Sequence, residues 1–147
     1  MQQGFGWHVP EYFNMAEVCS RRWAAQADAH TRVAIVEHAV ADTHDHDVAP
    51  RCASYAQLQQ AADAFSHVLT ALGVQRGDRV AIVLPQRLET AVAYIAVMQM
   101  GAVAMPLSQL FGPEALEYRL QDSEAVVAIV DASSVDSVLT VRAHCPA

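Results

Sequence analysis

The chain has 147 residues, the length of one ordinary domain. Hydrophobic residues make up 53% of it, which excludes intrinsic disorder as its general state, because disorder requires low hydrophobicity. Acidic residues outnumber basic ones by 16 to 9, and the net charge of −7 argues against a nucleic-acid partner. Every basic residue is an arginine, so the chain can form neither a Walker A phosphate loop nor a catalytic lysine.

Residues 1–53 are expected to form an N-terminal helix and a pair of strands. Asn14 and Glu17 have the spacing of a capping box, which predicts a helix from Asn14 to about Ala27. The β-branched segment 32–40 is typical of a strand, and residues 51–53 are expected to return as a short partner strand.

Residues 54–147 alternate between helical and apolar segments, the pattern of repeated βα units. Ser54 and Gln57 have capping-box spacing at the start of a helix that Gly73 ends. Three apolar runs at equal spacing then predict strands, separated by helices, with a last helix from about Ser133. The strands are expected at 79–84, 102–107 and 125–130, and the helices between them at 88–100 and 113–121. This alternation predicts an α/β fold, a mainly parallel sheet with flanking helices.

Burial should be greatest in the strands and in the helix 88–100. As members of central parallel strands, four side chains are expected to be almost fully buried; these are Ile82, Val83, Val127 and Ile129. The helix 88–100 is apolar on nearly every side and therefore needs cover on several sides. The few other elements hardly supply it, so residues 1–147 are expected to be one incomplete α/β domain, with a homodimer as one means of covering it.

Ligands of open parallel sheets bind beyond the carboxyl ends of the strands. Here those ends are 85–86, 108–110 and 131–133, and they carry several polar side chains. The serines could equally cap helices, and Asp131 could simply close a turn. No GxGxxG follows a strand and no GxSxG is present, which disfavours a Rossmann dinucleotide site and an esterase elbow.

A cluster of imidazoles and carboxylates lies around the loop between the first two predicted strands. Such groups can bind zinc, but a polar loop more often carries solvated charge, so no metal site is predicted. The cluster consists of His38, Asp42, His44, Asp45, His46 and Asp47. The three cysteines lack zinc-ligand spacing, and the N-terminus lacks the features of a secretory signal. The segment 91–107 is short and interrupted for a membrane span, so a cytoplasmic protein without membrane contact is expected.

An ordered series of motifs runs from Ser54 to Asp131. A helix led by Tyr55 ends at a Gly-Val pair, and GDRVAIVLP then forms a strand that ends in Leu-Pro. An apolar helix leads to MGAVAMPL, and LQDS precedes the strand AVVAIVD. This series resembles the N-terminal part of the acyl-CoA synthetases in the adenylate-forming, AMP-binding enzyme family. The upstream segment FNMAEVCSRRWA is similar to members that act on acetate, propionate or medium-chain acids.

The resemblance implies the N-terminal part of the large domain of the adenylate-forming fold, and a reaction in two steps. A carboxylic acid and ATP form an acyl-adenylate with Mg²⁺, and coenzyme A then displaces AMP. The family's phosphate loop and lysine are absent from this sequence. The chain is therefore expected to be catalytically incomplete, to bind no cofactor by itself and to contain no catalytic residue of the family. The resemblance implies that one segment, Ser108, Gln109, Leu110 and Phe111, lies near the coenzyme A nucleotide.

Two other functions remain open from the sequence. One is a noncatalytic interaction module that completes its core against another chain. The other is a small flavodoxin-like binding domain that shares only the βα pattern.

Overall fold

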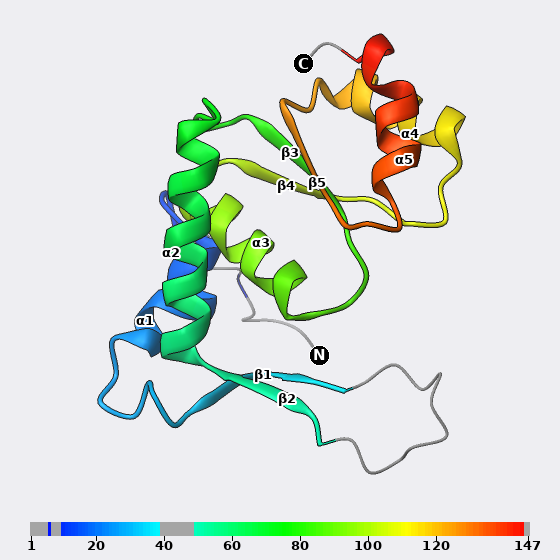
Figure 1. Ribbon diagram of the computed structural model, residues 1–147. Helices are drawn as coiled ribbons and strands as arrows, with labels where there is room; N and C mark the ends of the chain where they lie inside the picture. Colours follow the sequence, from blue (N-terminus) through cyan, green and yellow to red (C-terminus); the bar gives the residue numbers. More distant parts are fainter. Residues whose placement is uncertain (1–5, 7–9, 39–48, 146–147) are drawn as a thin grey trace.

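The computed structural model describes residues 6, 10–38 and 49–145. Its main body is a three-stranded sheet between two pairs of helices (Figure 1). Most of the predicted histidine and aspartate cluster lies outside the described residues, and this part comprises Asp42, His44, Asp45, His46 and Asp47.

The sheet is parallel throughout and has the order β4-β3-β5. β3 (Arg79–Val83) is the middle strand, with β4 (Val103–Pro106) on one side and β5 (Val127–Val130) on the other. α3 (Leu88–Gln99) joins β3 to β4, and α4 (Pro113–Ser123) carries the chain from β4 across to β5. The predicted α/β fold with a mainly parallel sheet is confirmed.

Each face of the sheet has its own apolar core. α2 (Tyr55–Ala71) and α3 cover one face, while α4 and α5 (Val135–Val141) cover the other, followed by the 3₁₀ turn η2 (Arg142–His144). Successive residues of a strand point to opposite faces. Val80 of β3 accordingly belongs to the core under α2 and α3, whereas Ala81 belongs to the core under α4 and α5.

The N-terminal helix begins as predicted and ends early. Asn14 Oδ1 accepts hydrogen bonds from the backbone N–H groups of Ala16 (2.9 Å) and Glu17 (3.3 Å). The helix then includes a π-helical segment, η1 (Glu17–Arg21), and stops with α1 (Arg22–Ala24) instead of reaching Ala27. Its last carbonyl groups accept bonds in tighter turns, which ends the regular pattern.

Two strands and a long helix connect this helix to the sheet. β1 (Val33–Glu37) pairs antiparallel with β2 (Arg51–Ser54), which leads directly into α2. The predicted capping box is present: Ser54 Oγ accepts from Gln57 N (3.3 Å), and Gln57 Oε1 accepts from Ser54 N (2.9 Å). Gly73 follows α2 with a φ of 90°, a conformation that suits glycine and ends the helix.

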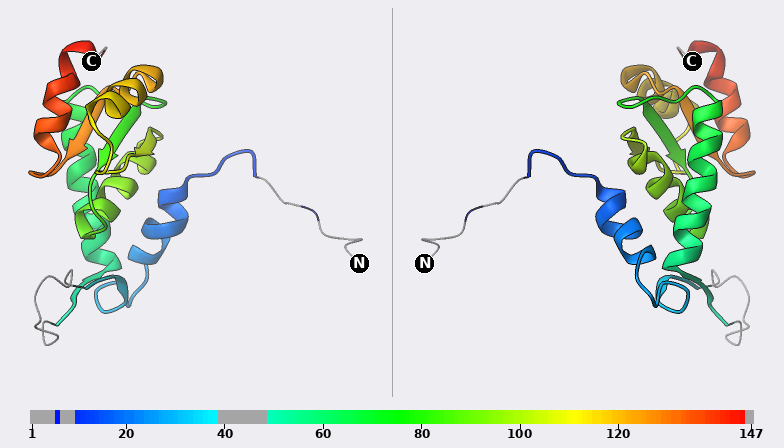
Figure 2. Two further views of the ribbon diagram at one scale, coloured as in Figure 1. Left: turned by 90° about the vertical axis from the view of Figure 1, so that its right-hand side faces the viewer. Right: turned by 90° about the vertical axis from the view of Figure 1, so that its left-hand side faces the viewer.

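The structure corrects the expectation that α3 lacks cover. Glu89 is the one exposed residue of this helix. Besides the sheet, α3 contacts α2, β1 and η1, so the N-terminal elements supply the cover that the sequence left unassigned. Figure 2 shows the N-terminal helix (blue) at one side of the molecule, beside α2 and α3. Within the described ranges, no helix is both long and apolar enough to cross a bilayer.

The burial predicted for the strands is right for β3 and wrong for β5. Ile82 and Val83 are 2% and 1% exposed, respectively. Val127 and Ile129 are only partly buried, because β5 is an edge strand of the described sheet and pairs only with β3. The equal spacing of the apolar runs contains no information on which strand lies in the middle.

Candidate functional site

The carboxyl ends of the three parallel strands meet at one end of the sheet (Figure 1). Asp131 follows β5, and its carboxylate contacts the segments that follow both other strands. Gln109 Nε2, after β4, donates to Asp131 Oδ1 at 3.2 Å. Arg87 Nη2, after β3, forms an ion pair with Asp131 Oδ2 at 3.4 Å. Because β4 and β5 lie on opposite sides of β3, this cluster occupies the switch point of the sheet, the usual ligand position in such folds.

Asp131 also closes the turn before α5. Its Oδ1 atom accepts from Ser133 Oγ (2.7 Å), Ser133 N (3.1 Å) and Ser134 N (3.2 Å). The Ser133 hydroxyl makes the largest contribution to holding the pKa of Asp131 below its ordinary value, since these bonds favour the charged carboxylate. Both oxygens of the Asp131 carboxylate are bonded, and its side chain is 16% exposed. Asp131 therefore has the structural role of closing a turn, which the sequence left open.

The four predicted site residues lie in three different environments. Ser108 and Gln109 lie at the switch point. Ser108 Oγ accepts from Leu110 N at 3.1 Å, and the two hydrogens of Gln109 Nε2 are shared among Asp131 Oδ1, Ser133 Oγ and Ser134 Oγ. Leu110 is 94% exposed and projects into solvent. Phe111 packs against the core under α4 and α5, with the guanidinium of Arg119 at 4.1 Å from the centre of its ring. In the strand-end loop 108–111, Leu110 is thus exposed to solvent, while Gln109 connects the loop by hydrogen bonds to the segment that follows β5.

The described residues do not fit a magnesium–triphosphate site. Among them, no three His, Cys, Asp or Glu side chains come together in a way that could hold a metal ion. His38, the described member of the predicted cluster, follows the end of β1. At the switch point, the positive charge of Arg87 is already paired with Asp131. We therefore derive no chemical step through Mg²⁺ or ATP from these residues.

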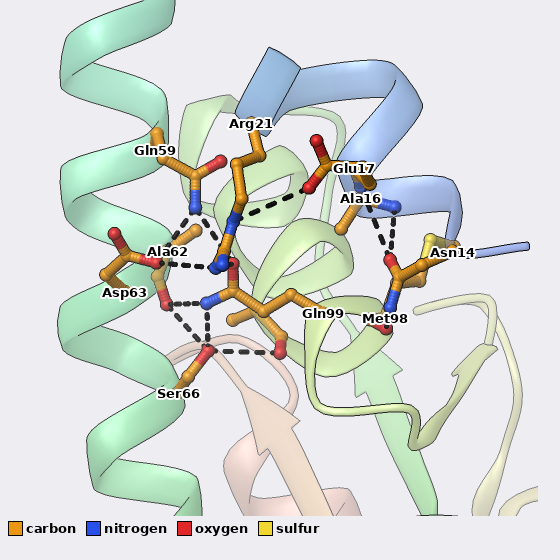
Figure 3. Close-up of polar contacts among 11 residues, drawn as sticks. Asn14, Ala16, Glu17, Arg21, Gln59, Ala62, Asp63, Ser66, Met98 and Gln99 are labelled. Atoms are coloured by element: carbon orange, nitrogen blue, oxygen red, sulfur yellow. Dashed lines mark hydrogen bonds and ion pairs between the residues drawn. The ribbon is translucent and has the colours of Figure 1, made fainter. Parts of the chain in front are cut away.

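A second polar cluster, which the sequence analysis missed, joins α2, α3 and the N-terminal helix (Figure 3). Gln99 Oε1 accepts from Gln59 Nε2 (2.9 Å) and Arg21 Nη2 (3.2 Å). Gln99 Nε2 donates to Ser66 Oγ and to the carbonyl of Ala62. Gln59 Nε2 also donates to Asp63 Oδ1 at 2.8 Å, and we call these five side chains the glutamine network. Its members are Arg21, Gln59, Asp63, Ser66 and Gln99.

One signal in the sequence pointed to this network. Gln99 is the one clearly polar residue in the apolar segment 91–107, and a buried amide needs hydrogen-bond partners. Its partners Gln59 and Ser66 lie on the buried side of α2, together with Ala62 and Leu69. They could not be identified from sequence, because α2 meets α3 only in the folded chain.

The comparisons with known proteins agree with this architecture. A family model described as "AMP-binding enzyme" matches residues 22–146. The mouse mitochondrial acyl-coenzyme A synthetase ACSM3 is 31% identical over 146 residues, which cover 99% of this chain and 25% of that protein. The acetyl-coenzyme A synthetase of Streptomyces coelicolor is 37% identical over 123 residues, covering 84% of this chain and 18% of that protein.

Solved structures of other proteins also superpose on most of this chain. ATP-bound MatB from Rhodopseudomonas palustris superposes with a TM-score of 0.71 at 30% identity, covering 89% of this chain and 24% of that one. An acyl-CoA synthetase from Brucella canis shares the fold, with a TM-score of 0.78 at 24% identity over 91% of this chain and 23% of that one. The chain thus spans a quarter or less of the length of these relatives. It belongs to the AMP-binding enzyme family and corresponds to the N-terminal part of the family's acyl- and acetyl-coenzyme A synthetases.

Proposed function

We propose that this chain supplies the N-terminal part of an ATP-dependent acyl-CoA synthetase. The observation that carries the proposal is the family match over residues 22–146, together with the similarity to relatives named as acyl- and acetyl-coenzyme A synthetases. In the proposed reaction, a carboxylate oxygen attacks the α-phosphorus of ATP and pyrophosphate leaves. The thiolate of coenzyme A then attacks the acyl carbon, and AMP leaves.

The chain alone is proposed to be catalytically incomplete. Both steps bring anions together, so they need fixed positive charge or a metal ion to offset the repulsion. The sequence has no lysine, and Arg87, at the switch point, is paired with Asp131. The role left to these residues is to build one edge of the site in a longer or reconstituted enzyme.

The strand-end loop 108–111 is the segment we propose to lie against the nucleotide of coenzyme A. Its position beyond the carboxyl end of β4 supports this role, as does the exposed apolar side chain of Leu110, which can pack against a flat base. Gln109 does not take part directly, because its amide is bonded to Asp131, Ser133 and Ser134. It instead fixes the loop from which Leu110 projects.

A chimera tests the proposal. Residues 22–146 would replace the matching segment of the Streptomyces coelicolor acetyl-coenzyme A synthetase, with that enzyme lacking the segment as the blank. We expect acetyl-CoA formation by the chimera and none by residues 1–147 alone. A folded but inactive chimera would argue against the synthetase role. Acid-dependent ATP–pyrophosphate exchange by the chain alone would contradict its incompleteness.

The role of the loop is tested in the same chimera. Leu110→Ala should raise the KM for coenzyme A and leave the KM for ATP unchanged. Leu72→Ala is the matched control, because Leu72 is also exposed but lies at the end of α2, away from the strand ends. Equal KM values for coenzyme A in the two variants would contradict the proposal that loop 108–111 lies against the nucleotide.

One observation favours a second candidate, a noncatalytic module. α3 is covered by elements of this same chain, so its apolar surface does not require the rest of a synthetase. A chimera without activity, together with cooperative unfolding of residues 1–147, would support the module.

A further inference from the structure

The N-terminal helical residues 15–24 place few fully buried side chains where they meet α2 and α3. The two fully buried side chains among them are Ala16 and Ser20, and both are small. The larger Met15 is 50% exposed. Trp23 is partly buried, and its ring centre lies 6.0 Å from that of Tyr55 on α2. Since the stabilisation from burial scales with the apolar area removed from water, Trp23 is the main apolar anchor of these residues.

Polar contacts add to this docking. Arg21 Nη2 donates to Gln99 Oε1 at 3.2 Å and lies 3.5 Å from Asp63 Oδ1. Asn14 Nδ2, just before the helix, donates to the carbonyl of Met98 at 3.1 Å. The ion pair is exposed to solvent, with the side chains of Arg21 and Asp63 54% and 48% exposed, so it contributes only weakly.

Two buried polar atoms oppose the docking. Ser20 Oγ and Gln59 Oε1 have no hydrogen-bond partner among the described residues. Ser20 lies within η1 and Gln59 on α2, the two elements that contact each other at this interface. In Figure 3 the amide oxygen of Gln59 points away from its bonded neighbours, toward the N-terminal helix. Undocking would let water reach both atoms, which relieves the cost of burying them unpaired.

The layers beneath do not depend on residues 15–24. Ser66 Oγ lies 2.9 Å from the carbonyl oxygen of Ala62 and 3.1 Å from that of Ala96, which share its one hydrogen, and it accepts from Gln99. These contacts join α2 to α3 without any atom of the N-terminal helix. Leu69, in the same interface, is fully buried. The α2–α3 pair therefore keeps its own polar and apolar contacts when the helix leaves.

We propose that residues 15–24 form a releasable clip, which undocks from α2 and α3 as a unit while the rest of the fold stays intact. The clip is held by Arg21, by Asn14 and by the packing of Trp23 on Tyr55, and its release is favoured by the unpaired Ser20 and Gln59 oxygens. Release uncovers the polar face formed by Gln59, Asp63 and Gln99, together with the part of α3 that η1 covers. The inference does not rest on the proposed enzymatic function.

Hydrogen exchange of the full 147-residue chain, resolved by peptide, tests the clip. Amides of residues 15–24 should exchange at least about tenfold faster than the central amides of α3. Arg21→Leu should accelerate exchange in residues 15–24 by on the order of tenfold and leave α3 unchanged, because it removes both contacts to the network. Glu17→Gln is the matched control: it removes a 3.9 Å pair with Arg21 inside the helix, and among the described residues the Glu17 side chain has no hydrogen bond or ion pair with α2 or α3.

A second variant should change the exchange rate of residues 15–24 in the opposite direction. Ser20→Ala removes a buried hydroxyl without a partner, so exchange in residues 15–24 should become slower. Faster exchange in Ser20→Ala would overturn the proposal, since it would mean that the hydroxyl is bonded when docked. Equal exchange of residues 15–24 and α3 in the unmodified chain, or equal acceleration of both by Arg21→Leu, would also overturn it.

Discussion

Ile82 and Ile129 form a matched pair for testing the sheet. They are neighbours in the β3–β5 register, and both carry the same side chain. Ile82 lies in the middle strand and is 2% exposed, whereas Ile129 lies in an edge strand and is partly exposed. Truncation to alanine removes the same atoms at both positions, so the difference between the variants isolates the effect of burial.

We expect Ile82→Ala to lower the free energy of unfolding by about 3–5 kcal/mol, the upper part of the range for buried Ile→Ala changes, because it loses transfer energy and leaves a cavity. Ile129→Ala should cost roughly half as much, since part of its side chain is already hydrated and the edge can relax. Urea denaturation followed by far-ultraviolet circular dichroism measures both values. Equal losses at the two positions would refute the placement of β3 in the centre and β5 at the edge.

Two further predictions concern Asp131 and self-association. The pKa of Asp131 is lowered in the fold, so its stabilisation is present above the unfolded value of about 3.9 and is lost as the pH falls through the lower folded value. The difference in urea midpoint between the unmodified chain and Asp131→Asn should therefore shrink below about pH 4, and a constant difference would contradict this. Self-association is still predicted, now through the edge strands β4 and β5, and sedimentation equilibrium showing only monomer at ~100 µM would reject it.

The spacing of residues along the sequence was sufficient to predict most of the helices and strands. The Ser54–Gln57 capping box and the glycine that ends α2 are present as predicted, because both depend on contacts within a few residues. The helices α3 and α4 and the three parallel strands also lie where the apolar periodicity placed them, within one or two residues at most ends.

Interior positions were harder to predict where elements meet. At α2, the apolar Leu72 is exposed, whereas the polar Gln59 and Ser66 are buried. An amphipathic pattern shows that a helix has a buried face, but the partner helix determines its width and which polar groups can be satisfied there. The π-helical segment of the N-terminal helix likewise had no signature in the spacing of its residues.

The sequence by itself determined the order and type of the elements, the family resemblance and the segments that end each strand. The tertiary structure alone decided that β3 is central, that the N-terminal elements cover α3, and that Arg87, Gln109 and Asp131 meet. Local elements form from neighbours a few residues apart, whose spacing is visible in the chain. Arg87 and Asp131 are 44 residues apart, and only the crossing of α4 over the sheet, which places β5 beside β3, brings their side chains within 3.4 Å.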